Sequence, residues 1–184
     1  MEYRELYNGV KMPMLGFGVY QVPDYNVAKQ SVLAALNNGY RLIDTAQAYQ
    51  NETAVGDAIR ESGIPREEIF VTTKLWIQDF TYEKALKATE LSLERLGLEY
   101  IDLMLLHQPM GDYCAAWKAL EKHYHDGKLK AIGMANCYPH VIADLCETFA
   151  VKPMVNQVEL HPFFQQPDNL SVMKDYDVVP EAWA

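Results

Sequence analysis

The feature that most constrains the fold is a regular alternation of strand-like apolar runs and segments with helical spacing. We predict strands over residues 15–18, 40–44, 69–74, 101–106, 130–135, 154–158 and 178–183. Helices are predicted between them, over residues 27–38, 52–62, 81–96, 113–125, 139–149 and 168–176. Such alternation implies parallel strands joined by right-handed crossovers. The order of elements is therefore typical of either a doubly wound sheet or a (β/α)8 TIM barrel.

The glycine pattern favours the barrel. Gly16-Phe17-Gly18 lacks the third glycine of a dinucleotide-binding loop and precedes no Gly-Lys-Ser/Thr. A complete barrel takes about 250 residues, and this chain of 184 residues offers only the seven strand candidates above. We expect residues 1–184 to form a single α/β barrel domain that is truncated before the eighth strand. Residues 1–15 are expected to form an N-terminal β-hairpin cap, with Asn8-Gly9 in a type I′ turn.

Charge and composition exclude several classes of protein. The formal charge of −9 disfavours nucleic acid as a partner. No apolar run approaches the roughly 20 residues of a membrane span, and the charged N-terminus is unlike a signal peptide. The cysteines, Cys114, Cys137 and Cys146, have neither disulfide-like nor metal-ligand spacing. We expect a cytoplasmic protein without a metal site, and a monomer or weak dimer.

Polar side chains stand at the carboxyl ends of successive predicted strands. Taken singly, each has an ordinary explanation, such as a turn cap for Asp44 or a satisfied core histidine for His107. In a parallel barrel, however, these strand ends meet on the face where barrel enzymes place their sites. The residues expected to share that face are Asp44, Lys74, His107, Asn136 and Gln157.

Tyr49 lies five residues beyond Asp44, close enough for its loop to fold back over the same face. A phenol with a pKa near 10 is a weak acid, but a neighbouring ammonium group lowers that pKa. Lys74 could supply the ammonium group, and Asp44 could compensate its buried charge. The pattern predicts a proton-donating assembly.

Several of these segments resemble the aldo-keto reductase family. The motifs are Leu15-Gly16-Phe17-Gly18, Gly39-Tyr40-Arg41-Leu42-Ile43-Asp44-Thr45-Ala46, Thr73-Lys74, Leu106-His107 and Asn156-Gln157-Val158-Glu159-Leu160-His161-Pro162. His107-Gln108-Pro109 and the segment at residues 180–184 are most similar to the microbial branch of diketogluconate and methylglyoxal reductases. The resemblance implies reduction of small carbonyl substrates by hydride from NADPH. It makes Tyr49 the general acid, Lys74 the group that lowers its pKa, Asp44 the partner of Lys74, and His107 the residue that orients the carbonyl.

The same resemblance implies residues for the two ligands. For the cofactor, Asn136 and Gln157 would bind the nicotinamide carboxamide and Trp183 would stack on its ring, while Gly18, Val19 and Asp44 would border it. For the substrate, the implied residues are Tyr20, Trp76, His107 and Gln108. For Trp76 and Gln108, packing at the rim of the pocket is as good an interpretation as substrate binding.

Two departures from the family pattern keep alternatives open. Ala135-Asn136-Cys137 replaces the usual Ser-Asn-Phe, so one hydroxyl donor to the carboxamide is missing, at a cost of about 1 kcal/mol. The chain stops at Ala184, before the family's eighth strand, its 2′-phosphate loop and its C-terminal segment. The alternatives are a cofactor-binding barrel without catalysis, serving as a redox-sensing or interaction subunit, and an inactive fragment.

Overall fold

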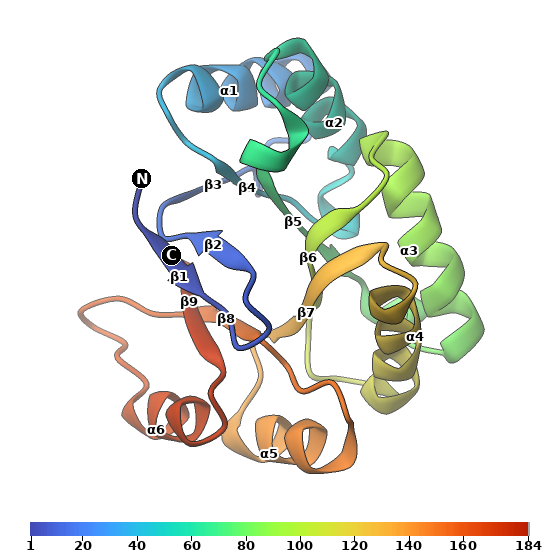
Figure 1. The fold of residues 1–184 in the computed structure, drawn as a ribbon, viewed down its shortest axis with the longest axis vertical. Helices are drawn as coiled ribbons and strands as arrows, with labels where there is room; N and C mark the ends of the chain where they lie inside the picture. The colour runs from blue at the N-terminus through green and yellow to red at the C-terminus, as the bar shows by residue number, and fades with distance from the viewer. Residues whose placement is uncertain (184) are drawn as a thin grey trace.

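The computed structural model describes residues 1–183 and contains a curled, parallel sheet of seven strands. The strands pair in strict chain order, from β3 at one edge to β9 at the other, as Figure 1 shows. This order confirms the parallel pairing predicted from the alternation of elements. The strands are β3 Gly16–Gly18, β4 Leu42–Asp44, β5 Phe70–Leu75, β6 Ile101–Leu106, β7 Leu129–Ala135, β8 Val155–Glu159 and β9 Val179–Trp183.

Helices cover the outer side of this sheet in an arc that runs from α1 to α6 (Figure 1). Each links one strand to the next, so the carboxyl ends of all the strands lie on the same face. Sequence spacing predicted residues 101–106 and 113–125 to the residue and most other boundaries to within one or two. The helices are α1 Tyr25–Asn37, α2 Glu52–Glu61, α3 Tyr82–Leu96, α4 Tyr113–His125, α5 Pro139–Thr148 and α6 Pro167–Asp175.

The N-terminal hairpin forms, but with a different turn from the one predicted. Strands β1 Tyr3–Glu5 and β2 Lys11–Pro13 pair antiparallel. Gly9 has a positive φ of 85°, whereas Asn8 does not, so the turn is not type I′, which needs positive φ at both central residues. The Asn8 side chain also makes a contact outside the hairpin: its amide donates to the Lys130 carbonyl at 3.0 Å. This contact ties the hairpin to the amino-terminal end of β7.

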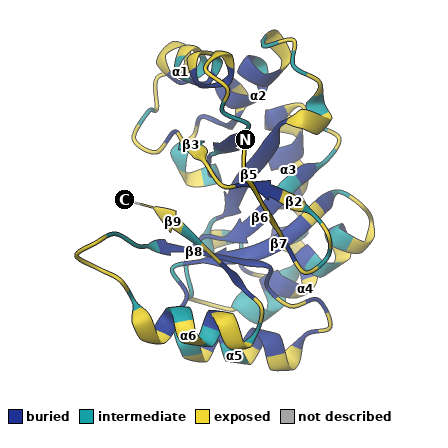
Figure 2. Cartoon of the chain, turned by 60° about the vertical axis from the view of Figure 1, so that its left-hand side comes forward, coloured by how far each residue is buried: buried dark blue, intermediate teal, exposed yellow. Residues whose placement is uncertain are grey.

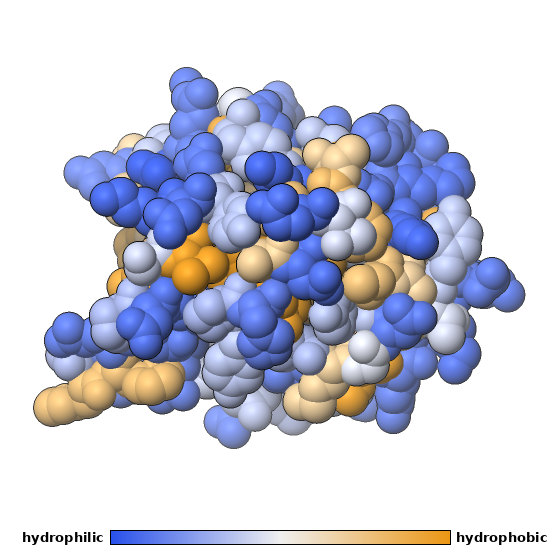
Figure 3. Space-filling model, turned by 90° about the horizontal axis from the view of Figure 1, so that it is seen from below, coloured by the Kyte–Doolittle hydropathy of each residue, from blue (hydrophilic) through white to orange (hydrophobic). Residues whose placement is uncertain are grey.

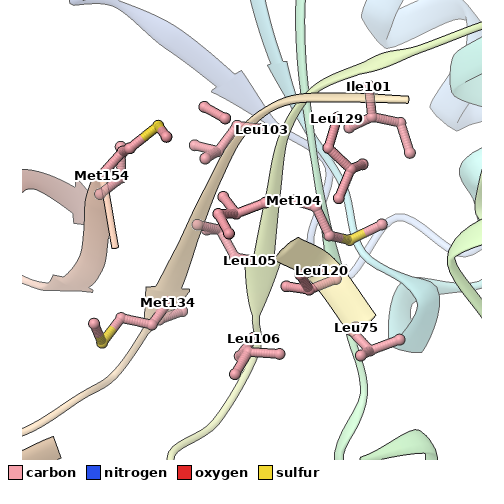
Figure 4. Close-up of a cluster of buried hydrophobic side chains, with 14 of the residues drawn as sticks. Leu75, Ile101, Leu103, Met104, Leu105, Leu106, Leu120, Leu129, Met134 and Met154 are labelled. Atoms are coloured by element: carbon pink, nitrogen blue, oxygen red, sulfur yellow. The ribbon is translucent and has the colours of Figure 1, made fainter. Parts of the chain in front are cut away.

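The core is centred on β6, whose apolar run was predicted to be buried on both faces. All of its residues are buried except the half-buried Asp102. Figure 2 shows the central strands β4 to β8 as the buried part of the molecule, with exposed residues on the outer sides of the helices. Leu103, Met104 and Leu105 of β6 pack among apolar side chains from β5, β7 and α4 (Figure 4). Each such side chain contributes about 1.5–3 kcal/mol when it leaves water, so the sheet holds the strand ends in fixed positions.

The described surface has few features that point to a membrane or a metal. On the face that Figure 3 shows, hydrophilic side chains predominate and hydrophobic ones gather in small groups. Among residues 1–183, every helix is too short or too polar to cross a lipid bilayer. The same part of the chain contains no cluster of histidine, cysteine and acidic residues able to hold a metal ion. All three cysteines are free thiols.

Candidate active site

A cavity of about 1210 Å³ runs along the inner side of the sheet, from the N-terminal hairpin to the carboxyl ends of the strands. It opens where the sequence predicted a site, because every crossover brings its strand end to this face. Lys74 is not part of the lining, but its ammonium group contacts two residues that are, Asp44 and Tyr49. The predicted site residues that line the cavity are Gly18, Tyr20, Asp44, Tyr49, Trp76, His107, Gln108, Asn136, Gln157 and Trp183.

Lys74 is the most deeply buried charged side chain of the site, with 1% of its surface exposed. Its ammonium group forms an ion pair with Asp44 and donates to the Thr45 carbonyl at 3.0 Å. Its third contact is the phenol oxygen of Tyr49, at 3.5 Å. A buried ammonium group needs such compensation. The sequence-based hypothesis that Asp44 holds Lys74 close to Tyr49 therefore agrees with the geometry.

Tyr49 is half-buried on the short 3₁₀ helix Gln47–Tyr49. Burial raises the pKa of Tyr49 above its usual range, Lys74 pulls it down, and Asp44 raises it again. Lys74 therefore acts in the predicted direction, but the net direction of the shift is upward. Desolvation of the phenolate outweighs the attraction of the ammonium group. The phenol is consequently protonated, and available as a donor, throughout the neutral range.

His107 is held by aromatic neighbours at the end of β6. Its ring packs edge-on against Trp76, with centroids 5.1 Å apart, and against Tyr49 at 5.7 Å. Burial and the nearby Lys74 lower the pKa of His107 to about 4. The imidazole is therefore neutral at physiological pH. Its Nδ1 is buried without a hydrogen-bond partner among the described residues.

Two side-chain amides and an indole form a hydrogen-bonded rim around the same cavity. Asn136 has a positive φ of 59° and donates to the His107 carbonyl at 3.1 Å. Its Oδ1 accepts from the indole N–H of Trp183 at 3.0 Å. The Gln157 amide donates to the second carboxylate oxygen of Asp44 at 2.9 Å. These contacts connect the ends of β4, β6, β7, β8 and β9 around the cavity.

Val19 and Lys74 are the predicted site residues that do not line the cavity. Val19 is fully buried. Its backbone N–H donates to the Asp44 carbonyl at 3.1 Å. The expectation that Val19 borders a cofactor can therefore apply only to its backbone. Residues that directly follow a strand alternate in direction, and Gly18 and Tyr20 occupy the positions that reach the cavity.

Sequence reasoning missed Asn51, which anchors the loop that carries Tyr49. Asn51 is 2% exposed and donates to the carbonyls of Val19 and Val22, both at 3.0 Å. Its Oδ1 accepts from the Thr45 hydroxyl at 2.6 Å. The side chain thus joins the loop after β4 to the loop after β3. No local pattern marks it, because the two carbonyls to which it donates lie about 30 positions away.

Glu181 was also missed as a site residue, although it lies in the cavity lining beside Gln157. A signal was present in the sequence. Trp183 had been assigned to the cavity, and residues two apart on a strand point to the same face. That rule places Glu181 on the inner face of β9.

Comparison with known proteins was consistent with this geometry. The sequence model of the Aldo/keto reductase family matches residues 14–184. A glyoxal reductase from Bacillus subtilis is 50% identical over 98% of this chain and 66% of its own length. A 9,11-endoperoxide prostaglandin H2 reductase from Trypanosoma cruzi is 49% identical over 97% of this chain and 64% of its length. The chain thus spans slightly less than two thirds of these curated relatives.

Solved structures show the same arrangement of elements. An aldo/keto reductase from Brucella melitensis superposes with a TM-score of 0.96 at 42% identity, covering 99% of this chain and 72% of that one. An aldo-keto reductase from Bombyx mori, solved in complex with NADP, gives a TM-score of 0.95 at 30% identity, covering 100% of this chain and 66% of that one.

Proposed function

The chain belongs to the aldo/keto reductase family, and from this membership and the geometry of the cavity we propose that it reduces aldehydes and ketones to alcohols with NADPH. It would act as an NADP-dependent oxidoreductase of CH–OH groups. The observation that carries the proposal is the position of the Tyr49 phenol, which lines the cavity with the buried ammonium group of Lys74 3.5 Å from its oxygen. A protonated acid and a neutral imidazole then border the same space.

The lining of the cavity fits a nicotinamide cofactor. A Cβ placed on Gly18 would meet nothing within 4 Å, so the backbone there leaves room for a ligand. Asn136 and Gln157 bring amide groups suited to a carboxamide, and Trp183 brings an indole ring suited to stacking. When bound, the cofactor would supply the hydride. That a structural neighbour was solved with NADP supports this choice.

In the proposed mechanism, Tyr49 gives its phenolic proton to the carbonyl oxygen as negative charge develops there. The ammonium group of Lys74 stabilises the charge left on the phenol oxygen, and Asp44 keeps that ammonium group in place. His107 donates a second hydrogen bond to the same oxygen. Since its Nδ1 is buried and has no acceptor in the described chain, we assign the single ring proton to Nε2.

We further propose that residues 1–184 form one domain that contributes seven strands to an eight-stranded barrel, with residues 1–15 as its cap. The substrates proposed are small carbonyl compounds such as methylglyoxal or diketo-sugar acids. The relative from Bacillus subtilis named glyoxal reductase supports a small dicarbonyl. Tyr20, Trp76 and Gln108 would contact the substrate beside His107.

The test is oxidation of NADPH by the full-length protein in the presence of methylglyoxal, followed by absorbance. Tyr49→Phe is expected to lower kcat by about 10²–10⁴-fold, because it removes the general acid. Cofactor binding, measured by fluorescence titration, is expected to persist in this variant. Tyr3→Phe is the matched control, because Tyr3 is exposed on the hairpin. Full activity of Tyr49→Phe would refute the assignment of the acid, and cofactor binding by the unaltered protein without turnover would favour the non-catalytic alternative.

A further inference from the structure

Glu181 is an acidic residue of the cavity that the mechanism above does not use. It stands on β9 directly opposite Gln157 of β8 in the strand register. Its carboxylate oxygen Oε2 is buried and has no hydrogen-bond partner among the described residues. An ionised carboxylate in that position would carry an uncompensated charge, which is costly in a buried place.

This carboxyl group lies beside the catalytic cluster. The Gln157 Nε2 donates to Asp44 at 2.9 Å, and Glu181 is the register partner of Gln157 on the neighbouring strand, close enough to Asp44 and Lys74 for both charges to act on it. Asp44 in turn forms the ion pair with Lys74. Two carboxyl groups therefore lie near one ammonium group. If both were ionised, the cluster would hold two negative charges against one positive charge.

We propose that Glu181 is a positioning residue that acts on Tyr49 through the ion pair of Asp44 and Lys74: its carboxyl group changes charge and thereby tunes how strongly Lys74 acidifies Tyr49. The inference rests on the proposed function, because it assigns Glu181 a role toward the proposed acid. Burial and the neighbouring Asp44 raise the pKa of Glu181 to about 7, while Lys74 and Gln157 act in the opposite direction. The carboxyl group then changes its charge within the physiological range of pH.

The direction of the effect follows from the charges around Glu181. Asp44 on β4 and Lys74 on β5 act on it directly, and Arg4, Tyr20, Tyr49 and His107 are the other charged or titratable side chains that line the cavity. Below pH 7, Glu181 is neutral, and the Lys74 charge is balanced by Asp44 alone. Above pH 7, a second negative charge opposes formation of the Tyr49 phenolate. Proton donation therefore becomes harder as pH rises through about 7.

The first test needs no catalysis. In the full-length protein, Glu181→Gln removes the titrating group and keeps the shape of the side chain. The pKa of Tyr49, obtained from tyrosinate absorbance of each protein against its own Tyr49→Phe version, is expected to be lower in Glu181→Gln than in the unaltered protein. The infrared band of a protonated carboxyl group that titrates near pH 7 is expected to disappear. An unchanged pKa of Tyr49, or a persisting band, would overturn the inference.

The second test is the pH profile of carbonyl reduction. The kcat of the unaltered protein is expected to fall by on the order of threefold as pH rises across 7, and Glu181→Gln is expected to lose this step. Glu181→Asp keeps a titrating carboxyl group and should retain the step. Glu94→Gln, an exposed change on α3, should also retain it. A step that persists in Glu181→Gln contradicts the inference, whereas absence of any reduction by the unaltered protein defeats the proposed function and leaves the spectroscopic test to decide on Glu181.

Discussion

The ammonium nitrogen of Lys74 lies 3.5 Å from the phenol oxygen of Tyr49 and 5.1 Å from the centre of its ring. The two residues come from the loop after β4 and from β5, 25 positions apart. At this distance the ammonium group favours the phenolate, but burial of the ring favours the phenol more strongly. Tyr49 is thus a protonated donor whose conjugate base has a partner already in place.

Removing Lys74 is expected to affect both the pKa of Tyr49 and the stability of the fold, and the two effects can be measured separately. Lys74→Met should raise the pKa of Tyr49 further, because the largest influence that lowers it is lost. It should also lower the free energy of unfolding by about 3–5 kcal/mol, since Asp44 is left without its ion-pair partner. The double variant Lys74→Met/Asp44→Asn should recover most of the stability and none of the reductase activity. Chemical denaturation and tyrosinate absorbance measure the two effects, and recovery of activity in the double variant would contradict the role of Lys74.

The neutral state of His107 predicts a specific loss of stability in acid. Its pKa is about 4 in the folded chain and about 6.5 in an unfolded chain. Above pH 6.5 both states are neutral, and this histidine adds no pH dependence. As pH falls from 6.5 to 4, the unfolded state takes up the proton first, so the free energy of unfolding decreases by about 3 kcal/mol in total. The free energy of unfolding, measured by urea denaturation at each pH, should fall less between pH 6.5 and 4 in His107→Gln than in the unaltered protein. An equal fall in the two proteins would show that His107 is not its cause.

Loss of the Asn51 side chain is expected to loosen the loop that carries Tyr49. Asn51→Ala leaves the carbonyls of Val19 and Val22 without their donor, and each unsatisfied buried group costs about 1–3 kcal/mol. We expect a loss of about 2–4 kcal/mol in the free energy of unfolding. The kcat should fall more than cofactor affinity does, because the loop no longer holds the Tyr49 phenol in a fixed position. The matched control is Asn38→Ala, which removes one exposed hydrogen bond to Ala34 and should cost less than about 1 kcal/mol.

Two substitutions of Trp183 are expected to distinguish the contribution of ring stacking to cofactor binding from that of the indole hydrogen bond. Trp183→Ala removes both and should weaken binding of NADPH by about tenfold, equivalent to about 1.4 kcal/mol. Trp183→Phe keeps an aromatic ring but loses the indole N–H that holds Asn136, so a smaller loss is expected. Fluorescence titration of the full-length protein gives both values. Tyr3→Ala, which changes an exposed aromatic residue on the hairpin, should leave the affinity unchanged, and an unchanged Kd in Trp183→Ala would remove this residue from the proposed cofactor site.

Much of the architecture followed from patterns of short range. Apolar runs and helical spacing are properties of neighbouring residues, so β6 and α4 were predicted with correct bounds. The rule that parallel strands end on one face then assembled Asp44, Lys74, His107, Asn136 and Gln157 without any distance being known. The resemblance to the aldo-keto reductases was confirmed by the family match. The hairpin was also predicted correctly, but its turn was not, because the Gly9 N–H donates to the Leu6 carbonyl and so places Tyr7 and Asn8, without positive φ, at the centre of the turn.

Folding decided the properties that depend on distances between remote residues. Gln157 and Asp44 are 113 positions apart in the chain and 2.9 Å apart across the cavity, and no spacing rule predicts that contact. Lys74 lowers the pKa of Tyr49 as predicted, but the net direction depends on how much water the folded chain removes from the phenol, which the sequence does not reveal. The placement of Glu181 beside Gln157 and Asp44 has the same origin. Residue type and spacing specify which groups reach the cavity, whereas desolvation and contact between distant strands determine their charge and their partners.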